Sequence, residues 1–334
     1  MVVSLDSRLD AHNAPRFVEV LQPFISEGGR RVIFDCAGLE YVSSAGLREF
    51  IAAAKKLKSL GGSCAFAALS PAVSELFTVS GLKDLLEIHK SVAEAERFKP
   101  TATAPEAAGA EGGHSDLTLT EEMALLALDD QTGRWLDLPY SAIDSVLAGA
   151  VLADLSLAGR IDTDLNCLTV LDAKPTGNAL LDRRLKLMAD AREKLSVSGW
   201  LKELMREAED IREVALAQLV QKGVLRREEK RILWAIAVRR YPTLDGRERV
   251  EVRTRLRELI LGDGLPDGRD AMLFGLLYGC GLLEGLFGIE ECEKRAERIR
   301  QLAKLDLVGR STTAVIKEAT DVLYKAVLNS GMQF

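Results

Sequence analysis

Two adjacent serines, Ser43 and Ser44, lie where a buried strand passes through a loop into a helix. Residues 35–47 read DCAGLEYVSSAGL. A serine at the start of a helix can cap it by accepting a hydrogen bond from a free N–H group. The position also suits phosphorylation, because a phosphate would face the positive end of the helix dipole and add about two negative charges to a surface that a partner could bind. Both interpretations stay open on these residues alone.

A second candidate is basic. Residues 222–257 contain 12 Lys and Arg and 5 Asp and Glu, although the whole chain has a net charge of -6. The basic residues bracket the apolar run 232–238, ILWAIAV. In a bilayer interface Trp234 would lie at headgroup level and the arginines would attract anionic lipid, at about 1 kcal/mol per basic residue. A core strand beside a solvated charged helix would show the same pattern.

Other chemistries have little support. The five cysteines are scattered without a CxxC pair, which predicts a reducing cytoplasm and neither disulfides nor a zinc site. No histidine follows residue 114, and there is no glycine-rich phosphate loop or catalytic cluster. We therefore expect no enzyme, no metal and no cofactor. The acidic chain has no recognisable nucleic-acid-binding module, so we expect no nucleic acid partner.

The elements that position these residues belong to two predicted domains. Residues 101–116 are rich in Ala, Gly, Thr and Glu without a large apolar side chain, which predicts a flexible linker. It separates a domain of residues 1–100 from one of residues 117–334. No run reaches the 18 or so apolar residues of a membrane span, and the N-terminus lacks the pattern of a secretory signal. A cytoplasmic location is expected.

The first domain alternates strand and helix patterns. Strands are predicted at 2–5, 31–35 and 63–69, with helices after Asn13, after Ser44 and after Ser70. This alternation predicts a small α/β domain with a sheet covered by helices.

The second domain is predicted to be a mostly α-helical bundle with a β-hairpin. Thr118 and Glu121 form a capping box, and the runs 146–153 and 275–283 suit buried helices. A further helix is predicted to present Ile289, Cys292, Ala296, Ile299 and Leu302 on one face. The hairpin is predicted at 224–240, with a charged turn at 227–230 and a strand at 232–238. Asp245 and Glu248 then predict a capped helix.

Residues 1 to about 98 resemble a STAS domain, the fold of anti-sigma-factor antagonists. The matching pieces are LDSRLD at 5–10, VSSAGL at 42–47, SPAVSELF at 70–77 and VSGL at 79–82. The resemblance implies that Ser44 is the phosphoacceptor, with Ser43 where the family often has Asp. It also implies that a serine kinase that is itself an anti-sigma factor, or a similar regulator, is the partner. STAS domains also occur as scaffolds that are not phosphorylated.

Residues 117 to about 328 resemble the Golgi-phosphoprotein adaptor family, whose eukaryotic members bind phosphatidylinositol 4-phosphate. The matching pieces are LTLTEE at 117–122, LADLSLAGR at 152–160, PTGNALLD at 175–182 and LVQKGVL at 219–225. The resemblance implies a helical fold and peripheral membrane association. It also implies that the hairpin, with Leu233 near its insertion point, contacts the bilayer or a second subunit. The fused STAS domain suggests a bacterial protein.

The headgroup pocket of that family uses a tryptophan, an arginine and two further basic residues. The corresponding positions here are Pro139, Ala148, Glu209 and Arg212. Only Arg212 matches; Trp135 or Tyr140 could replace the tryptophan, whereas Glu209 would repel a phosphate. Less specific attraction to anionic phospholipid headgroups is therefore expected. The predicted lipid-binding residues are Arg212, Arg226, Arg227, Arg231, Arg239 and Arg240, and the predicted insertion residues are Ile232, Leu233 and Trp234.

These patterns predict a non-enzymatic regulatory adaptor. A phospho-switchable, anti-anti-sigma-like STAS module would be joined to a domain that binds anionic lipid at the inner face of the membrane. The alternative is a structural scaffold in which both domains mediate only protein contacts and the hairpin joins the subunits of a homo-oligomer.

Overall fold

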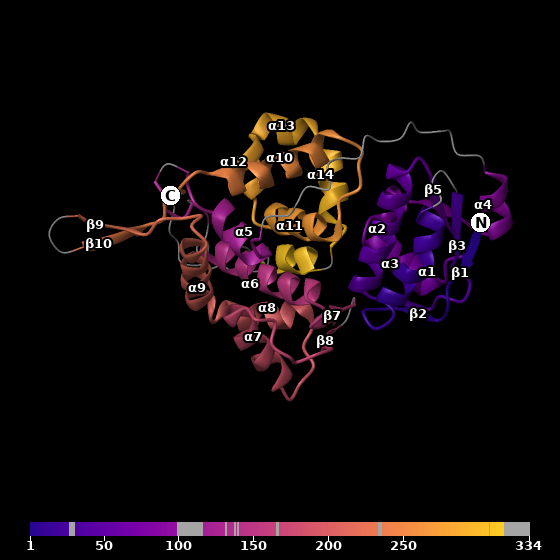
Figure 1. The fold of residues 1–334 in the computed structure, drawn as a ribbon, viewed down its shortest axis with the longest axis horizontal. Coiled ribbons are helices and arrows are strands. Elements are labelled where there is room, and N and C mark those ends of the chain that lie inside the picture. The colour runs from indigo at the N-terminus through magenta and orange to yellow at the C-terminus, as the bar shows by residue number, and fades with distance from the viewer. Residues whose placement is uncertain are drawn as a thin grey trace, which may run out of the picture.

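The computed structural model describes residues 1–26, 31–98, 116–130, 132–136, 138, 140–164, 167–232, 236–306 and 308–316. The predicted linker 101–116 lies outside the described residues except for Asp116. An α/β N-terminal part, residues 1–98, lies beside a mostly helical C-terminal part, residues 116–316 (Figure 1). The predicted fold class is therefore confirmed.

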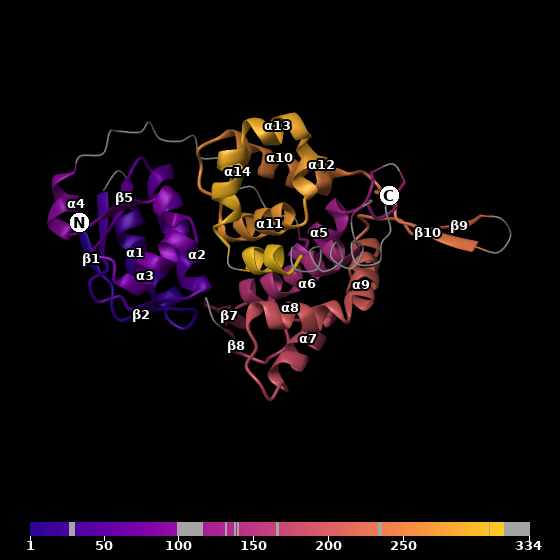
Figure 2. The same cartoon turned by 180° about the vertical axis from the view of Figure 1, so that it is seen from behind.

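The N-terminal part is built on a parallel sheet. Its strands lie in the order β1 (Val2–Ser4), β3 (Arg31–Asp35), β5 (Ser63–Ala67) and β6 (Glu87–His89). A separate short parallel ladder joins β2 (Arg8–Leu9) to β4 (Tyr41–Val42). The helices α1 (Ala14–Ser26), α2 (Ser44–Ser59) and α3 (Pro71–Val79) lie on one side of the sheet, and α4 (Val92–Arg97) lies on the other (Figures 1 and 2). A 3-10 turn, η1 (Leu82–Asp84), follows α3.

The alternation of strand side chains explains this arrangement. One face of the sheet contributes to a core with five phenylalanines, whose neighbouring rings lie 5.0 to 6.2 Å apart: Phe17, Phe34, Phe50, Phe66 and Phe77. The other face packs Ile33 and the small residues Ala65 and Ala67 against Ala95 of α4. The face with the phenylalanines therefore holds three helices, and this smaller cluster holds one short helix.

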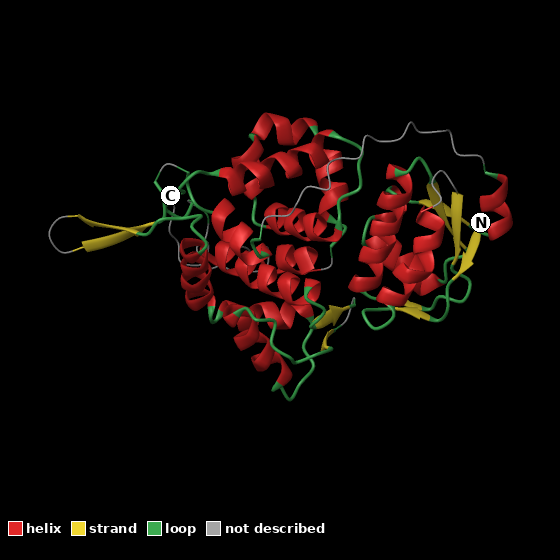
Figure 3. Cartoon of the chain, in the orientation of Figure 1, coloured by secondary structure: helices red, strands yellow, loops and turns green. Residues whose placement is uncertain are grey.

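Within the described residues, the C-terminal part contains the ten helices bounded below, a further helical segment at residues 308–316 and two hairpins (Figure 3). The helices are α5 (Leu119–Leu126), α6 (Tyr140–Leu157), α7 (Ala179–Ala189), α8 (Val197–Met205), α9 (Ala208–Gln221), α10 (Arg247–Leu261), α11 (Gly268–Gly279), α12 (Leu282–Phe287), α13 (Ile289–Lys294) and α14 (Ala296–Ala303). The hairpins join β7 (Ile161–Thr163) to β8 (Leu168–Val170), and β9 (Glu228–Ile232) to β10 (Ile236–Arg240).

Helix α6 is the centre of this part. Its residues 146–153 are buried, as their continuous apolar run predicts, and α5, α8, α9 and α11 pack around it. None of the helices in the described ranges combines the length and the hydrophobicity that a membrane span requires.

The basic hairpin has a different register from the predicted one. Residues 228–230, which were expected to form the turn, lie in β9 and pair with residues 238–240 of β10. The connection instead runs between Ile232 and Ile236, so the apolar run that we predicted as one strand straddles it. A two-stranded ribbon that projects from the protein tolerates charged side chains along its strands, which removes the usual signal for a turn. Leu233 and Trp234 lie outside the described residues.

Two predicted helices also differ. Helix α10 begins after Gly246, which has a φ of 69° and no side-chain cap, so the predicted capping box of Asp245 and Glu248 is wrong. Asp245 instead accepts a hydrogen bond from the N–H of Arg247 at 3.1 Å. The predicted helix through 289–302 is divided between α13 and α14 at Arg295, and Ile289 is 62% exposed.

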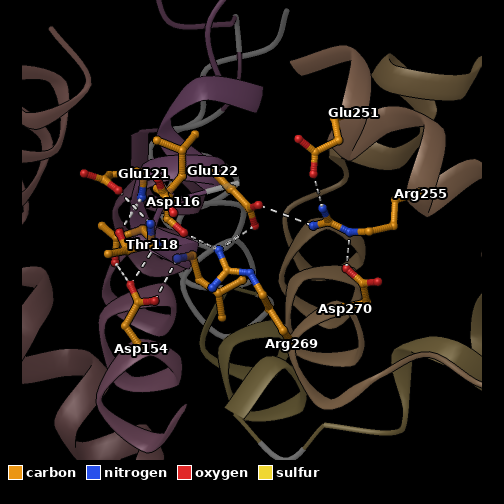
Figure 4. Close-up of polar contacts among 12 residues, drawn as sticks. Asp116, Thr118, Glu121, Glu122, Asp154, Glu251, Arg255, Arg269 and Asp270 are labelled. Carbon is orange, nitrogen blue, oxygen red and sulfur yellow. Dashed lines mark hydrogen bonds and ion pairs between the residues drawn. The ribbon is translucent and has the colours of Figure 1, made fainter. Parts of the chain in front are cut away.

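Charged and polar groups tie the start of α5 to α6 (Figure 4). The Thr118 hydroxyl accepts from the N–H of Glu121 at 3.2 Å, and the Glu121 carboxylate accepts from the N–H of Thr118 at 2.6 Å. The predicted capping box is thus confirmed. Asp154 of α6 accepts from the N–H of Leu119 at 2.7 Å and from the N–H of Thr120 at 2.9 Å. A buried carboxylate therefore satisfies the free N–H groups of α5.

Glu122 ties α5 to two further helices (Figure 4). Its side chain is fully buried and lies 3.3 Å from Arg255 of α10 and 3.1 Å from Arg269 of α11. Arg255 also contacts Asp270 at 2.6 Å and Glu251 at 3.2 Å. Buried charges require such pairing, because an isolated one would be costly to remove from water.

Replacing Arg255 with leucine should destabilise the C-terminal part severely. Arg255→Leu leaves the carboxylates of Glu122 and Asp270 buried without this guanidinium, so we expect a loss of roughly 3–5 kcal/mol in the free energy of unfolding. Urea titrations followed by tryptophan fluorescence measure it, because all three tryptophans follow residue 116. The matched control is Arg300→Leu, whose ion pair with Glu297 is exposed and screened by water, so its loss should change the free energy of unfolding little. Equal losses in both variants would contradict the prediction.

Asp154 should make stability depend on pH. Burial raises the pKa of Asp154 from 3.8 to about 6, although hydrogen bonds from Thr120 and Leu119 act in the opposite direction. Since the folded pKa exceeds the unfolded one, this group stabilises the fold below about pH 4 and loses that contribution as the pH rises through about 6. The wild-type free energy of unfolding minus that of Asp154→Asn should fall by roughly 3 kcal/mol between about pH 4 and pH 7. A pH-independent difference would be the contrary result.

Candidate functional site

The predicted phosphoacceptor serines occupy the start of α2. Ser43 is the N-cap, with extended backbone, and its side chain accepts from the N–H of Gly46 at 3.3 Å. Ser44 is the first helical residue and is only 3% exposed. The capping role therefore belongs to Ser43. The Ser44 hydroxyl does not cap the helix and contacts a different group.

Close packing at Gly46 fixes this end of the helix. A Cβ at residue 46 would lie 2.5 Å from the carbonyl oxygen of Leu9 and 2.9 Å from a methyl of Val42. Only glycine therefore lets the first turn of α2 approach the short ladder of β2 and β4. The same approach places the start of α2 beside residues 8–11.

Asp162 of β7 receives the Ser44 hydroxyl. Ser44 Oγ donates to Asp162 Oδ1 at 3.1 Å, and the N–H of Ala45 donates to the same oxygen at 3.2 Å. The other oxygen, Oδ2, accepts from the N–H of Ala11 at 3.0 Å. Asp162 is 6% exposed, so a carboxylate of the C-terminal part is buried against the helix N-terminus of the N-terminal part. We name this contact the Asp162 seam.

Tyr41 extends the seam along the same hairpin. Its hydroxyl donates to Asp164 Oδ2 at 3.1 Å, and the Arg8 guanidinium lies 4.5 Å from the centre of its ring. Burial, followed by the negative charge of Asp164, raises the pKa of Tyr41. Tyr41 therefore stays protonated and acts as a hydrogen-bond donor across the seam.

Arg48 forms the next part of the seam, one helical turn after Ser44. Its guanidinium lies 3.5 Å from the carbonyl oxygen of Ser156, and its alkyl chain crosses Gly268 at the start of α11. Burial lowers the pKa of Arg48, while Asp306 and Asp162 act in the opposite direction. The two carboxylates of the C-terminal part therefore offset the cost of burying this cation.

The periphery of the seam is polar. Arg310 donates to the carbonyl oxygen of Val79 at 2.7 Å, and Lys55 lies 3.9 Å from Asp267. Buried apolar residues of both parts also belong to one continuous cluster. The two parts thus have both apolar and polar contact around the central carboxylate.

The basic hairpin projects from the opposite end of the helical part, away from the N-terminal part (Figures 1 and 2). The structure places Arg226 and Arg227 on its approach, Arg231 and Ile232 in β9, and Arg239 and Arg240 at the end of β10. Arg226 pairs with Glu228, and Arg239 pairs with Glu213 at 3.0 Å. Acidic neighbours therefore partly neutralise the predicted lipid-binding arginines.

The local charge of the segment 222–257 overstates its basic surface. Arg249, Arg253 and Arg255 of α10 face the interior or its border, where they contact carbonyl oxygens or carboxylates. Arg257 pairs with Glu291 at 2.7 Å, and Lys222 pairs with Glu121 at 2.7 Å. These acidic partners lie mostly outside residues 222–257, so the net charge of that segment does not include them.

The described residues at the positions of the headgroup pocket are poorly suited to hold a phosphate. Arg212 pairs with Asp144, and Ala148 is fully buried. Glu209 borders a shallow hollow lined by Arg183, Arg206, Glu207, Glu209, Asp210 and Glu213. Its carboxylates outnumber its guanidiniums, which disfavours an anion. Pro139 lies outside the described residues.

No group of three or more His, Cys, Asp and Glu in the described ranges is arranged to hold a metal ion.

The sequence alone gives no indication of Asp162, Asp164 or Tyr41 as site residues. Their contacts join positions more than a hundred residues apart, which no spacing pattern in the chain reveals.

Comparison with known proteins gives two family matches. The family model of Golgi phosphoprotein 3 (GPP34) matches residues 119–319, and the model of the STAS domain matches residues 1–95. The Asp162 seam therefore joins residues of one matched region to residues of the other.

Two curated proteins match the same two regions. The vacuolar protein sorting-associated protein 74 of Eremothecium gossypii is 35% identical over 135 residues, which is 34% of this chain and 40% of that protein. The putative anti-sigma factor antagonist BtrV of Bordetella bronchiseptica is 33% identical over 100 residues, which is 30% of this chain and 86% of that protein. The chain thus spans less than half the length of the fungal relative and most of the bacterial one.

Proposed function

The chain belongs to the Golgi phosphoprotein 3 (GPP34) family and carries an N-terminal STAS domain, and from this premise we propose that it is a regulatory adaptor switched at Ser44 and attached to anionic membranes by its basic hairpin. Its two proposed sites are well separated: the start of α2 lies at the seam between the two domains, whereas the hairpin projects from the far end of the helical domain (Figure 1). The observation that carries the proposal is this separation, because the first site can change its partner while the hairpin stays at the bilayer.

Ser44 suits a phosphoacceptor by its place in the fold. It is the first residue of the 16-residue helix α2, where the dipole favours negative charge. In the transfer, the Ser44 oxygen bonds to the γ-phosphorus of ATP, the bond to the ADP oxygen breaks, and the hydroxyl proton passes to a base of the kinase. The matching antagonist from Bordetella supports a regulator of the anti-sigma class, or a similar serine kinase, as the partner.

The proposed membrane contact is made by the hairpin of β9 and β10. Arg226, Arg227, Arg239 and Arg240 lie where β9 and β10 leave the helical part, and Leu233 and Trp234 follow β9 in the sequence. Arginines that flank an aromatic and apolar tip suit a peripheral contact with anionic phospholipids at the inner membrane surface. With Arg212 paired to Asp144, the proposed recognition depends on charge density and not on one headgroup.

Acidic substitutions at Leu233 and Trp234 should abolish membrane binding. Leu233→Asp with Trp234→Asp places two carboxylates in the segment that we propose to enter the interface, so sedimentation with vesicles of phosphatidylcholine and phosphatidylglycerol should show no bound protein. The matched control is Val250→Asp with Ile289→Asp, at positions 64% and 62% exposed outside the hairpin. Undiminished binding of the tip variant would refute the membrane role, and an oligomer that ignores lipid in light scattering would then favour the scaffold.

The hairpin arginines should supply the electrostatic part of the binding. Arg239→Ala with Arg240→Ala should weaken vesicle binding by roughly 30-fold, at about 1 kcal/mol per basic residue. Arg192→Ala with Lys194→Ala, both exposed in the loop after α7, removes the same charge elsewhere and should change it little. The difference between the two variants should shrink as salt is added, because exposed charges are screened. Equal weakening in both would indicate a general charge effect without a hairpin site.

Phosphorylation should modify Ser44. Incubation of the full chain with ATP and the anti-sigma serine kinases of the same organism should add one phosphate to the peptide that contains Ser44, as measured by mass spectrometry. Ser44→Ala should lose the phosphate and Ser43→Ala should retain it. A phosphate that persists in Ser44→Ala would assign the modification to another residue.

A further inference from the structure

The Ser44 surface is covered by the same chain. This inference rests on the proposed role of Ser44 as phosphoacceptor. We propose that the GPP34 domain of the same chain occupies the surface around Ser44. The carboxylate of Asp162 fills the anion site at the start of α2. Docking of the two domains and phosphorylation of Ser44 therefore exclude each other.

The first step of the argument is that Asp162 satisfies the groups that would hold an anion. Its two oxygens accept from Ser44 Oγ at 3.1 Å, from the N–H of Ala45 at 3.2 Å and from the N–H of Ala11 at 3.0 Å. Its own neighbour Thr163 adds an N–H at 2.9 Å. Ser44 and Ala45 belong to the first turn of the 16-residue helix α2, where a negative charge is favoured, and Ala11 lies beside it. The carboxylate is therefore bound as a ligand of the STAS domain.

The second step is charge. A phosphate on Ser44 carries a charge of about −1.5 to −2 and replaces the hydroxyl proton that Asp162 now accepts. The two anions would lie side by side in a buried place, with Asp164 close by at Tyr41. Like charges repel far more strongly there than in water. Arg48 faces the site, but it already interacts with Asp162 and with Asp306. The positive charge in the seam thus offsets the carboxylates already there and leaves none for an added phosphate.

The third step is access. Transfer of a phosphate requires the serine oxygen to face ATP in line with the bond that breaks, whereas Ser44 is 3% exposed and its hydroxyl faces Asp162. The docked form therefore cannot be the substrate of a kinase. Opening must precede modification, and modification must prevent closing.

The test uses the full chain with phosphoserine placed at residue 44 during translation, so that no kinase is needed. Hydrogen–deuterium exchange of peptides that contain Ala11 and Ala45 measures docking, because both amides donate to Asp162. Exchange should rise by about tenfold or more in the phosphoserine protein and in Asp162→Ala, as expected for the loss of hydrogen bonds to a charged group. Asp190→Ala, exposed at the end of α7, is the matched control and should exchange like the wild type. Wild-type protection in the phosphoserine protein would overturn the inference.

A charge reversal separates repulsion from misfolding. Asp162→Lys should open the seam of the unmodified chain, because it places an ammonium group at the helix N-terminus. Combined with phosphoserine at residue 44, the same lysine should restore protection at Ala45, since phosphate and ammonium attract each other. A damaged fold would not recover on adding a second change. Continued rapid exchange in this double variant would also overturn the inference.

The kinase assay separates this inference from the proposed function. A kinase that modifies Ser44 should modify Asp162→Ala about tenfold faster than the wild type or Asp190→Ala, because only the open form exposes the Ser44 hydroxyl. If no kinase modifies any of these chains while phosphoserine still opens the seam, the phospho-switch of the proposed function fails and the docking inference stands. If Ser44 is modified equally fast in all of them, the docking inference fails and the proposed function stands.

Discussion

Burial of Glu122 is the constraint on which the helical domain depends. A carboxylate with no exposure to water requires cations of fixed position, and Arg255 and Arg269 supply them from α10 and α11. The same helix α5 is held at its start by Asp154 of α6. Four helices are therefore locked to one another by charge as well as by apolar packing (Figure 4). The C-terminal end of α6 leads directly into β7, so this lock also determines where Asp162 lies.

Local patterns in the sequence predicted much of this architecture. The capping box of Thr118, the apolar run 146–153 and the strand at 31–35 all depend on neighbouring residues, and all three match the structure. The register of the β9–β10 hairpin could not be predicted from such patterns, because its strands carry charged residues and its connection interrupts an apolar run. A pattern of polarity locates a turn only where the strands themselves have a buried face.

The candidate site was predicted in part for a related reason. Ser44 was recognisable from the strand, loop and helix around it, whereas Asp162 approaches it only through the packing of two domains. For the basic segment 222–257 the sequence instead overestimated the charge on the surface. Counting charges along the chain credited Arg249 and Arg255 to the surface, although both side chains are largely buried and contact groups of other segments. Charge along a sequence and charge on a surface agree only where the charged residues are exposed.

The position of Asp162 on the same chain as Ser44 has a consequence for competition. Because the two domains are covalently joined, docking is a first-order process, and its effective concentration is of millimolar order for short connections. A separate protein that binds the same surface competes against that local concentration and not against the cellular concentration of the chain. A partner present at micromolar levels must therefore bind the free surface far more tightly than Asp162 does in order to displace it. Diluting the protein leaves the docked fraction unchanged, because docking is intramolecular.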